Sequence, residues 1–298
     1  MKLLFKKRKG LSTQLELDVQ RKREPDRNHY HGGRSFYFFD FDDNIAYLTT
    51  PIWIFHKKTG NPIKLSSGEY AHFKNAVGRY GKYADYEFNY GPQGSFKSFR
   101  DKNLRFYNRM LGEKQDFVLD VKDVLSYPDF DWKGPSWNTF YHAVYNRRPL
   151  SLITARGHKP ETIVKGISQF VKKGFLPNEP NYLSIFPVNC ESTQLDLTGQ
   201  FNEGANISKL KQMAIRKSVE QAIQQYGENP YHRFGMSDDD PDNIKMIIEE
   251  MARLKQELPE NSFFVISTHG GALVKTEIFT DHTVDVCLSE RAEQLSLL

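Results

Sequence analysis

The stretch FYFFDFDDNIAY, residues 36–47, decides how this chain folds. Its first four residues are aromatic, and their β-propensity predicts a buried strand over residues 35–41. Three carboxylates then follow within four positions, at Asp40, Asp42 and Asp43. Carboxylates a few ångströms apart raise one another's pKa, so such a cluster needs a compensating cation. The stretch therefore predicts a core strand with a reaction site at its end.

The composition is that of a soluble protein with a sizeable core, with 298 residues, 39% hydrophobic and 26% charged. No apolar run approaches the ~20 residues of a membrane helix, and the start, MKLLFKKRKG, lacks the apolar segment of a secretory signal. Cys190 and Cys287 lie far apart without a second ligand at metal spacing, which argues against a disulfide framework. We therefore expect a cytoplasmic protein that does not span a membrane.

The net charge of +4 is unevenly distributed. Residues 1–34 contain ten Lys or Arg and four acidic residues and carry +6, whereas the other 264 residues contain 31 basic and 33 acidic residues and carry −2. A basic tail can bind nucleic acid or an anionic membrane through counterion release, but a solvated leader is the more common case. Nucleic acid therefore stays an alternative binding partner, but it is not the favoured one.

Strands and helices alternate in the second half of the chain. Apolar runs predict strands over 150–156, 181–188, 231–237 and 262–268, and periodic patterns predict helices over 160–174, 208–226 and 243–260. This alternation predicts an α/β fold with a doubly wound, mostly parallel sheet that helices cover on both faces.

The middle of the chain lacks this regular alternation of strands and helices. Residues 49–149 are irregular and rich in aromatics, with a β-hairpin expected near their start around the turn signal KKTGNP. The simplest organisation is a core of 35–48 plus 150–298, a basic tail of 1–34, and an inserted domain of 49–149. The insert's aromatics are expected to form mostly its own core.

Three predicted strands end on polar residues, at Asp40, Thr154 and Asp238. Ligands of open parallel sheets bind outside the carboxyl ends of the strands, so these ends are expected to converge on one site. Mg²⁺ prefers one or two carboxylates together with water and substrate phosphate. The convergence therefore predicts a Mg²⁺ and reaction site.

Three segments carry a resemblance to a known family. FYFFDFDDNI, LSLITARG and RFGMSDDDPDNI, in this order, resemble motifs one, two and four of the haloacid dehalogenase-like (HAD) hydrolase superfamily. The resemblance covers residues 35–48 and 149–268, and each motif gains weight because it closes a predicted strand. It implies a Rossmann-like HAD core in which residues 49–149 form a cap, and a Mg²⁺-dependent phosphatase.

The resemblance also implies roles for individual residues. Asp40 would be the nucleophile that forms an aspartyl-phosphate, and Asp42 the general acid and base. Thr154 would donate its hydroxyl to the phosphoryl group. Asp40, Asp42 (through its backbone carbonyl) and Asp238 would hold the metal ion. Asp43 is expected to be structural or solvated.

Two positions of the site have more than one candidate. The family's third motif is a phosphate-binding lysine near a helix start, and the candidates are Lys209, Lys211 and Lys217. Lys211 is preferred because, with Ser208 as the helix cap, it lies in the first turn beside the backbone donors that favour anions. Either Asp242 or Asp239 would support the metal. Arg156, directly after the second motif, is either a substrate contact or a surface ion pair.

The sequence departs from the family pattern at two places. Asn44 stands where family members usually carry Thr or Val, and Asn can still bond the local backbone. Alignment on the glycine of RFGMSDDD would place Met236 at the metal. Alignment on the strand end places Asp238 there, and is preferred because a carboxylate binds a hard cation.

The expected substrate is a small phosphorylated molecule. The acid at position 42 argues for hydrolysis of an oxygen ester, and the basic and aromatic residues of the insert suit an anionic, ring-bearing molecule such as a nucleotide. Two alternatives stay open, a nucleic-acid end-processing phosphatase and a catalytically silent binding protein with the same fold.

Overall fold

The structure is a computed structural model that describes residues 22–287, except for 106, 108, 109, 111, 128–130, 272, 281 and 282. Its described residues form a seven-stranded sheet in the order β10-β9-β8-β7-β1-β5-β6. The strands are β1 (Ser35–Phe39), β5 (Pro149–Thr154), β6 (Asn181–Pro187), β7 (Arg233–Asp238), β8 (Ser262–Ser267), β9 (Val274–Ile278) and β10 (Thr283–Cys287). The five strands from β8 to β6 are parallel, and β9 and β10 add an antiparallel edge that the sequence patterns did not predict.

Strand β1 lies at the centre of the parallel strands because its aromatic residues supply apolar surface to both faces. Phe36 and Phe38 belong to the hydrophobic cluster on one face, and Phe39 belongs to the cluster on the other. Alternate residues of a strand point to opposite faces, so a strand buried on both faces needs a continuous apolar run. The predicted α/β fold with a mostly parallel, Rossmann-like sheet is confirmed.

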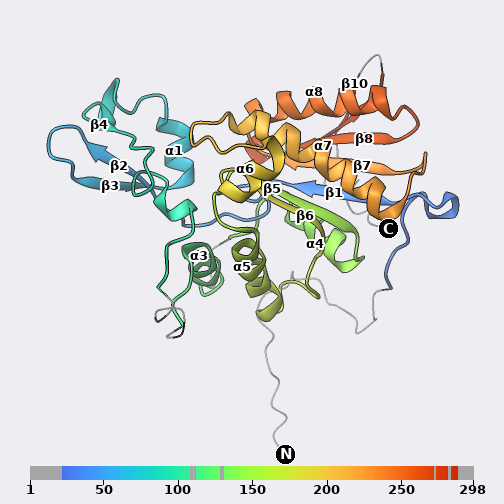
Figure 1. The fold of residues 1–298 in the computed structure, drawn as a ribbon, viewed down its shortest axis with the longest axis horizontal. Helices are drawn as coiled ribbons and strands as arrows, with labels where there is room; N and C mark the ends of the chain where they lie inside the picture. The colour runs from blue at the N-terminus through green and yellow to red at the C-terminus, as the bar shows by residue number, and fades with distance from the viewer. Residues whose placement is uncertain are drawn as a thin grey trace, which may run out of the picture.

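Helices cover both faces of the sheet (Figure 1). One face carries α7 (Ile207–Tyr226) and α8 (Pro241–Glu257), with α6 (Glu191–Thr198) beside α7. The other face carries α3 (Asp116–Val124), α4 (Trp137–Tyr145) and α5 (Pro160–Lys172). Helix α7 begins one residue earlier than expected, since the side chain of Asn206 accepts a hydrogen bond from the amide of Lys209 and caps the helix.

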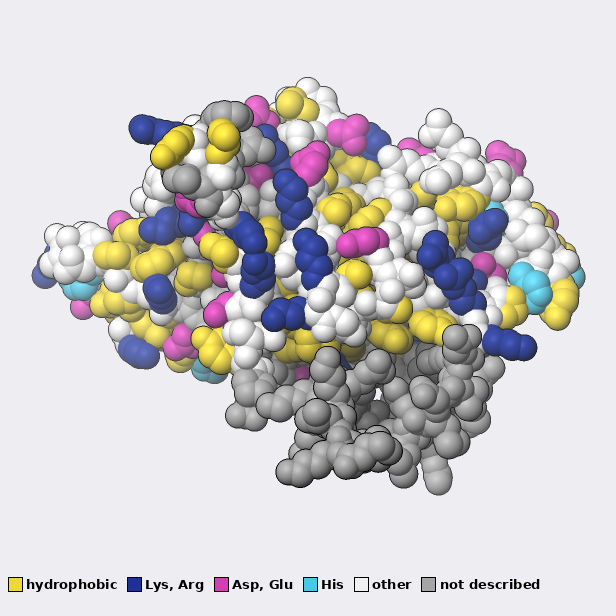
Figure 2. Space-filling view, turned by 90° about the horizontal axis from the view of Figure 1, so that it is seen from below, with side chains coloured by type: hydrophobic (Ala, Val, Ile, Leu, Met, Phe, Trp, Pro, Cys, Tyr) yellow, Lys and Arg dark blue, Asp and Glu magenta, His cyan; other side chains and the backbone are white. Residues whose placement is uncertain are grey.

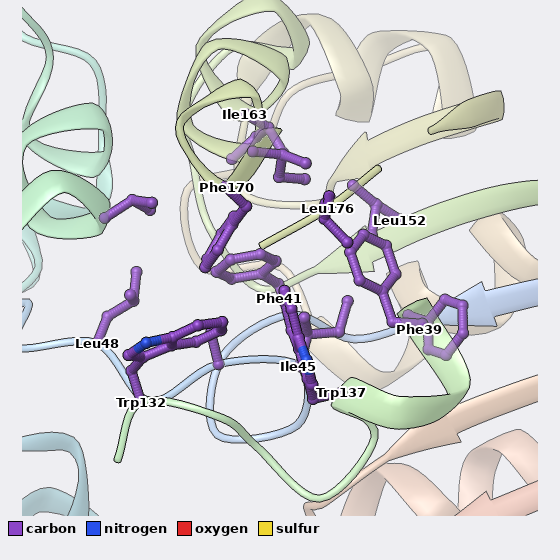
Figure 3. Close-up of a cluster of buried hydrophobic side chains, with 14 of the residues drawn as sticks. Phe39, Phe41, Ile45, Leu48, Trp132, Trp137, Leu152, Ile163, Phe170 and Leu176 are labelled. Carbon is purple, nitrogen blue, oxygen red and sulfur yellow. The ribbon is translucent and has the colours of Figure 1, made fainter. Parts of the chain in front are cut away.

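Part of the segment 49–149 packs directly against the main sheet. Helices α3 and α4 contribute Phe117 and Phe140 to the cluster that also holds Phe39. Figure 3 shows Trp132 beside Phe170 of α5 in the same cluster, with ring centres 5.0 Å apart. These residues therefore belong to the core of the main sheet.

A second, small sheet lies beside the end of the main sheet at which β1 stops (Figure 1). It contains β2 (Ile52–His56), β3 (Pro62–Leu65) and β4 (Tyr86–Glu87), accompanied by α1 (Ser67–Phe73). Strands β2 and β3 pair antiparallel as a hairpin around the predicted turn. Its aromatic residues largely pack together in a separate hydrophobic cluster, as expected of the insert's aromatics. The expectation is wrong for Phe117, Trp132 and Phe140, which pack in the core of the main sheet.

The described part of the basic tail, residues 22–34, contacts the main sheet. Asp26 accepts a hydrogen bond from the amide of Ser35 and forms an ion pair with Arg148. The expectation for residues 1–21 falls outside the described residues. Four short 3₁₀ helices complete the described structure, at His29–His31, Gly81–Tyr83, Lys97–Phe99 and His269–Gly271. Among the helices described, none has the length and apolar character to cross a bilayer.

A glycine permits the close approach of α3 and α5. A Cβ added at Gly166 of α5 would lie 2.2 Å from the ring of Phe117 on α3. We expect Gly166→Ala to lower the free energy of unfolding by about 1–2 kcal/mol, because the overlap outweighs the gain in helix propensity. Urea unfolding measures the change. Gly68→Ala is the control, since a Cβ at Gly68 of α1 has open space, and equal unfolding curves for the two variants would contradict the packing argument.

Candidate active site

Three charged side chains meet where β1 and β7 end. Asp40 directly follows β1, Asp238 is the last residue of β7, and Lys211 lies one turn into α7. The Lys211 Nζ is 2.6 Å from Asp238 Oδ2 and 3.1 Å from Asp40 Oδ1. All three residues are buried. The ammonium thus balances part of the negative charge that the sequence crowds at these strand ends.

Burial and mutual charge shift the proton affinity of these groups. Burial raises the pKa of Asp40 well above its usual range, and Asp238 and Asp239 raise it further, while Lys211 lowers it. Burial by itself lowers the pKa of Lys211, but the carboxylates of Asp238 and Asp40 outweigh this and raise it. The lysine is therefore charged at neutral pH, and the carboxyl groups compete for its charge.

A third carboxylate completes the cluster. Asp40, Asp238 and Asp239 each offer an oxygen, and these oxygens lie within 4.8 Å of one another. Burial, followed by the charges of Asp238 and Asp43, raises the pKa of Asp239 to about 7. Lys211 supplies one positive charge against three carboxyl groups, so the cluster retains room for more positive charge.

The residues present fit a hard divalent cation. Oδ1 of Asp40 is buried and, despite the ion pair with Lys211, has no hydrogen-bond donor among the described residues. Asp238 is oriented by the amide of Asp240 and by Asn243, at 3.0 and 3.2 Å from its Oδ1. Three carboxylates with an unsatisfied oxygen match the ligand preference of Mg²⁺ and similar ions. The cluster is a candidate metal site, and its chemistry does not identify which cation it takes.

Asn44 holds three strand ends together. Its amide nitrogen donates to the backbone oxygens of Asp40 (3.0 Å) and Ser237 (3.1 Å). Its amide oxygen accepts from the hydroxyls of Ser237 (3.0 Å) and Thr268 (2.9 Å). These four bonds use the full capacity of the buried side chain. Asn44 bonds the local backbone, as its sequence position suggested, but it also fixes the ends of β7 and β8 relative to Asp40.

The carboxylate of Asp42 lies on Arg156 instead of joining the cluster. Arg156 Nε donates to Asp42 Oδ2 at 2.8 Å, and its Nη2 donates to Oδ1 at 2.6 Å. The guanidinium also donates to Thr50 and lies 4.8 and 4.6 Å from the ring centres of Phe99 and Phe117. Arg156 is completely buried, so the expectation of a surface ion pair is wrong: neighbouring aromatic rings enclose it.

The chain turns sharply at Asp43, directly after Asp42. Asp43 adopts a left-handed backbone conformation with φ +56°, which Asp tolerates better than most residues. Its side chain accepts a hydrogen bond from Ser67 at the start of α1. Burial, and then the charge of Asp42, raises the pKa of Asp43 to about 6. The hydrogen bond from Ser67 to Asp43 therefore links α1, which accompanies the small sheet, to the site.

Thr154 is buried at the end of β5, the strand next to β1. Its Oγ1 accepts a hydrogen bond from the amide of Arg156 at 3.3 Å. Within the described residues its side chain forms no hydrogen bond with the carboxylate cluster. The neighbouring strand ends nevertheless keep Thr154 at the same edge of the sheet as Asp40.

The structure thus brings together Asp40, Lys211 and Asp238 of the expected site residues. Among the other lysines considered, Lys209 is exposed and Lys217 pairs with Asp196. Of the two supporting acids, Asp239 lies in the cluster and Asp242 is exposed.

The sequence patterns missed several supporting residues. Asn243 was not considered, although it begins the helical pattern directly after the acidic run. Asp240 caps α8 and Pro241 begins it, which turns the chain so that Asn243 returns to Asp238. The bond from Asn44 to Thr268 spans 224 residues, and no local pattern marks such a contact.

His158 is a buried histidine beside Arg156. Neither ring nitrogen has a hydrogen-bond partner among the described residues, and the ring lies 5.6 Å from that of Phe117. Burial, with a smaller effect of the Arg156 charge, lowers the pKa of His158 to about 2. The histidine is therefore neutral at physiological pH and acts as part of the packing around Arg156.

Comparison with known proteins identifies no relative: no family model, no curated protein and no solved structure matches this chain.

Removal of the Asn44 side chain tests its role in the site. We expect Asn44→Ala to lower the free energy of unfolding by about 3 kcal/mol, because buried backbone and hydroxyl groups lose their partners. Urea unfolding gives the value. The control is Asn178→Ala, which removes one weak 3.4 Å contact with Arg147 and should change stability by less than about 0.5 kcal/mol. An Asn44→Ala protein as stable as this control would refute the assigned role.

His158 makes the folded state sensitive to acid. Because its pKa falls from 6.5 to about 2 on folding, the unfolded chain binds a proton that the folded chain does not. The resulting stability is present above pH 6.5 and is lost as the pH falls. Between pH 7 and pH 5, wild type should lose about 2 kcal/mol more than His158→Phe.

Urea unfolding at both pH values measures this difference. The control is substitution of the exposed His72 by Gln, which should leave the wild-type pH dependence unchanged. Parallel loss of stability in wild type and His158→Phe would show that His158 does not titrate on unfolding.

Proposed function

We propose that this chain is a Mg²⁺-dependent phosphohydrolase of the HAD-like type that cleaves a phosphate monoester through an aspartyl-phosphate on Asp40. One observation carries the proposal: the buried residues Asp40, Lys211 and Asp238 and the partly buried Asp239 share one cluster at the carboxyl ends of two neighbouring parallel strands. Ligands of such sheets bind at this edge. The first motif segment supplies the nucleophile, Asp40, and the fourth supplies the metal-binding acid, Asp238, in the order that the family resemblance implies.

Asp40 is suited to attack phosphorus. In the first step its carboxylate oxygen forms a bond to phosphorus while the bond to the ester oxygen breaks, and the leaving oxygen takes a proton from Asp42. In the second step water attacks phosphorus and gives a proton to Asp42, and the bond from phosphorus to Asp40 breaks. The products are an alcohol, inorganic phosphate and the original carboxylate.

Lys211 and the neighbouring groups hold negative charge during these steps. The buried ammonium lies between Asp40 and Asp238 and would stabilise the charge that develops on the phosphoryl oxygens. Thr154 would donate its hydroxyl to one of these oxygens. Asp40, Asp238 and Asp239 would hold Mg²⁺, joined by the backbone carbonyl of Asp42. When bound, Mg²⁺ would offset the carboxylate charge and favour approach of the phosphate.

The proposed role of Asp42 requires a rearrangement. Its carboxylate accepts two hydrogen bonds from Arg156, whereas a general acid must reach the leaving oxygen beside Asp40. A rotation of the Asp42 side chain away from Arg156 would meet this requirement. The small sheet would act as the cap, since Asp43 already bonds Ser67 at the start of α1.

The ion pair between Asp42 and Arg156 favours a second candidate, a catalytically silent binding protein. A bidentate pair between Asp42 and a buried guanidinium is costly to break. If it persists in the presence of substrate, the chain would bind a phosphorylated ligand without turnover.

A basic surface favours a third candidate, phosphatase activity on nucleic-acid ends. Figure 2 shows Lys and Arg side chains gathered near the middle of the face that α3 and α5 cover. The Lys114 ammonium lowers the pKa of Lys122, with smaller effects of Lys172 and Lys173, so these cations lie near one another. Activity on oligonucleotide ends that falls steeply with added salt would support this candidate.

Phosphate release from an aryl phosphate tests the proposal. The full chain should release phosphate with Mg²⁺ but not with a chelator, and Asp40→Asn should reduce the rate at least about 1000-fold because the nucleophile is lost. Asp42→Asn should reduce it about 100-fold or more. The control is Asp196→Asn, which removes an exposed carboxylate on α6 and should act as wild type.

Two outcomes would decide against hydrolysis at Asp40. Equal rates for Asp40→Asn and Asp196→Asn would mean that another group performs the chemistry. Absence of turnover across a panel of phosphorylated metabolites would favour the silent binding protein.

A further inference from the structure

A cleft of about 500 Å³ lies on the face of the main sheet that α3, α4 and α5 cover. Helix α4 packs on β1 and α5 packs on β6. The cleft is bounded by α4, by residues 24–30 and by β1, β7, β8 and β9. It lies toward the amino ends of β1 and β7, where Ser35 and Arg233 begin the strands. The carboxylate cluster lies at the opposite ends of the same strands, so the two sites are separate.

Strand alternation explains why this surface is charged. Phe234, Phe263 and Ile278 point into the cluster beneath α7 and α8. Residues at odd spacing from them point to the other face. On that face, Arg233 and Lys275 line the cleft.

Two cations flank one aromatic ring in the cleft. The guanidinium carbon of Arg233 lies 4.7 Å from the centre of the Phe264 ring, and the Nζ of Lys275 lies 4.1 Å from it. Both charged side chains are partly buried, and within the described residues neither has an ion-pair or hydrogen-bond partner for its charged group. Burial, and then the charges of Arg233 and Arg27, lowers the pKa of Lys275 to about 8.

A third cation in the wall has an unsatisfied donor. Arg148 forms an ion pair with Asp26 at 2.8 Å and donates to the backbone oxygen of Glu24 at 2.8 Å. Its Nε is buried and has no partner among the described residues. A buried donor without an acceptor costs free energy, which a bound acceptor would recover.

The charges around the cleft leave it positive. Among the described residues that line the cleft, the four cations Arg27, Arg148, Arg233 and Lys275 outnumber the two carboxylates Glu24 and Asp26, and Asp26 is occupied by Arg148 and by the amide of Ser35. Glu277 also acts on the charges of Arg233 and Lys275. We propose that this cleft binds a phosphate-bearing organic anion of nucleotide size. Arg233 and Lys275 would bind the phosphate, and the aromatic wall would contact the ring of the ligand. The volume lies within the range of small-molecule sites, roughly 300–1,000 Å³.

Isothermal titration of the full chain with AMP tests the proposal. A chelator in the buffer keeps divalent cations from the carboxylate cluster, so phosphate binding there does not contribute. Wild type should bind AMP, and Lys275→Gln and Arg233→Gln should each weaken binding at least about tenfold because a charge-assisted contact is lost. The matched control is Lys245→Gln, on exposed α8 surface beyond the opposite face of the sheet, which should bind as wild type.

Two further measurements distinguish specific AMP binding from a loss of folding in the variants and from non-specific electrostatic attraction of the phosphate. AMP should protect Lys275 of the unmodified wild-type chain from acetylation, while Lys245 reacts equally with and without AMP. Inorganic phosphate should bind more weakly than AMP, since it lacks the ring. The proposal is overturned by no AMP binding at millimolar concentration, by equal affinities for Lys275→Gln and Lys245→Gln, by unprotected Lys275, or by equal binding of AMP and phosphate.

Discussion

The buried ammonium of Lys211 is the interaction on which the rest of the site depends. Asp40 and Asp238 end neighbouring strands of one sheet, so the backbone brings their carboxylates together whether or not their charge is balanced. Two such groups away from water repel each other strongly, and loss of a buried partner leaves an uncompensated charge. Lys211 lies within contact of both, which ties the position of α7 to the ends of β1 and β7. The helix that covers one face of the sheet therefore also sets the electrostatics at its edge.

A neutral network supports this charged centre. Asn44 joins the backbone at Asp40 to β7 and to Thr268, the residue after β8. Ser237, which also bonds Asn44, shares a hydrogen bond of 2.5 Å with the hydroxyl of Ser136. The charged groups set the electrostatics of the site, and the polar groups fix its geometry. A buried network of this kind rigidifies a site when every member is satisfied. By contrast, Asp42 lies outside this network, and its role depends on whether Arg156 releases it.

Local patterns predicted the parallel sheet, the hairpin and the convergence of the strand ends at Asp40 and Asp238, because each rests on strand and helix periodicity plus one general rule for sheet edges. Lys211 was expected at this site only from the family resemblance. Local patterns missed what long-range packing decides. Helices α3 and α4 lie in a stretch that appeared irregular, and their apolar residues make sense only against α5 and the sheet. The antiparallel strands β9 and β10 follow the last predicted element, and no pattern marked them. Arg156 was expected either at the substrate or at the surface, yet Phe99 and Phe117 enclose it.

The sequence by itself determined that an aromatic strand would be buried in a parallel sheet and end in carboxylates, since propensity and alternation are properties of neighbouring residues. Only the tertiary structure decided that Asp239 would join Asp40 and Asp238 while Asp42 turned to Arg156. The same is true of the cations around Phe264, which come from two strands and lie together through sheet order. The physical reason is that charge and burial depend on distances through space, and those distances exist only once the strands have found their neighbours.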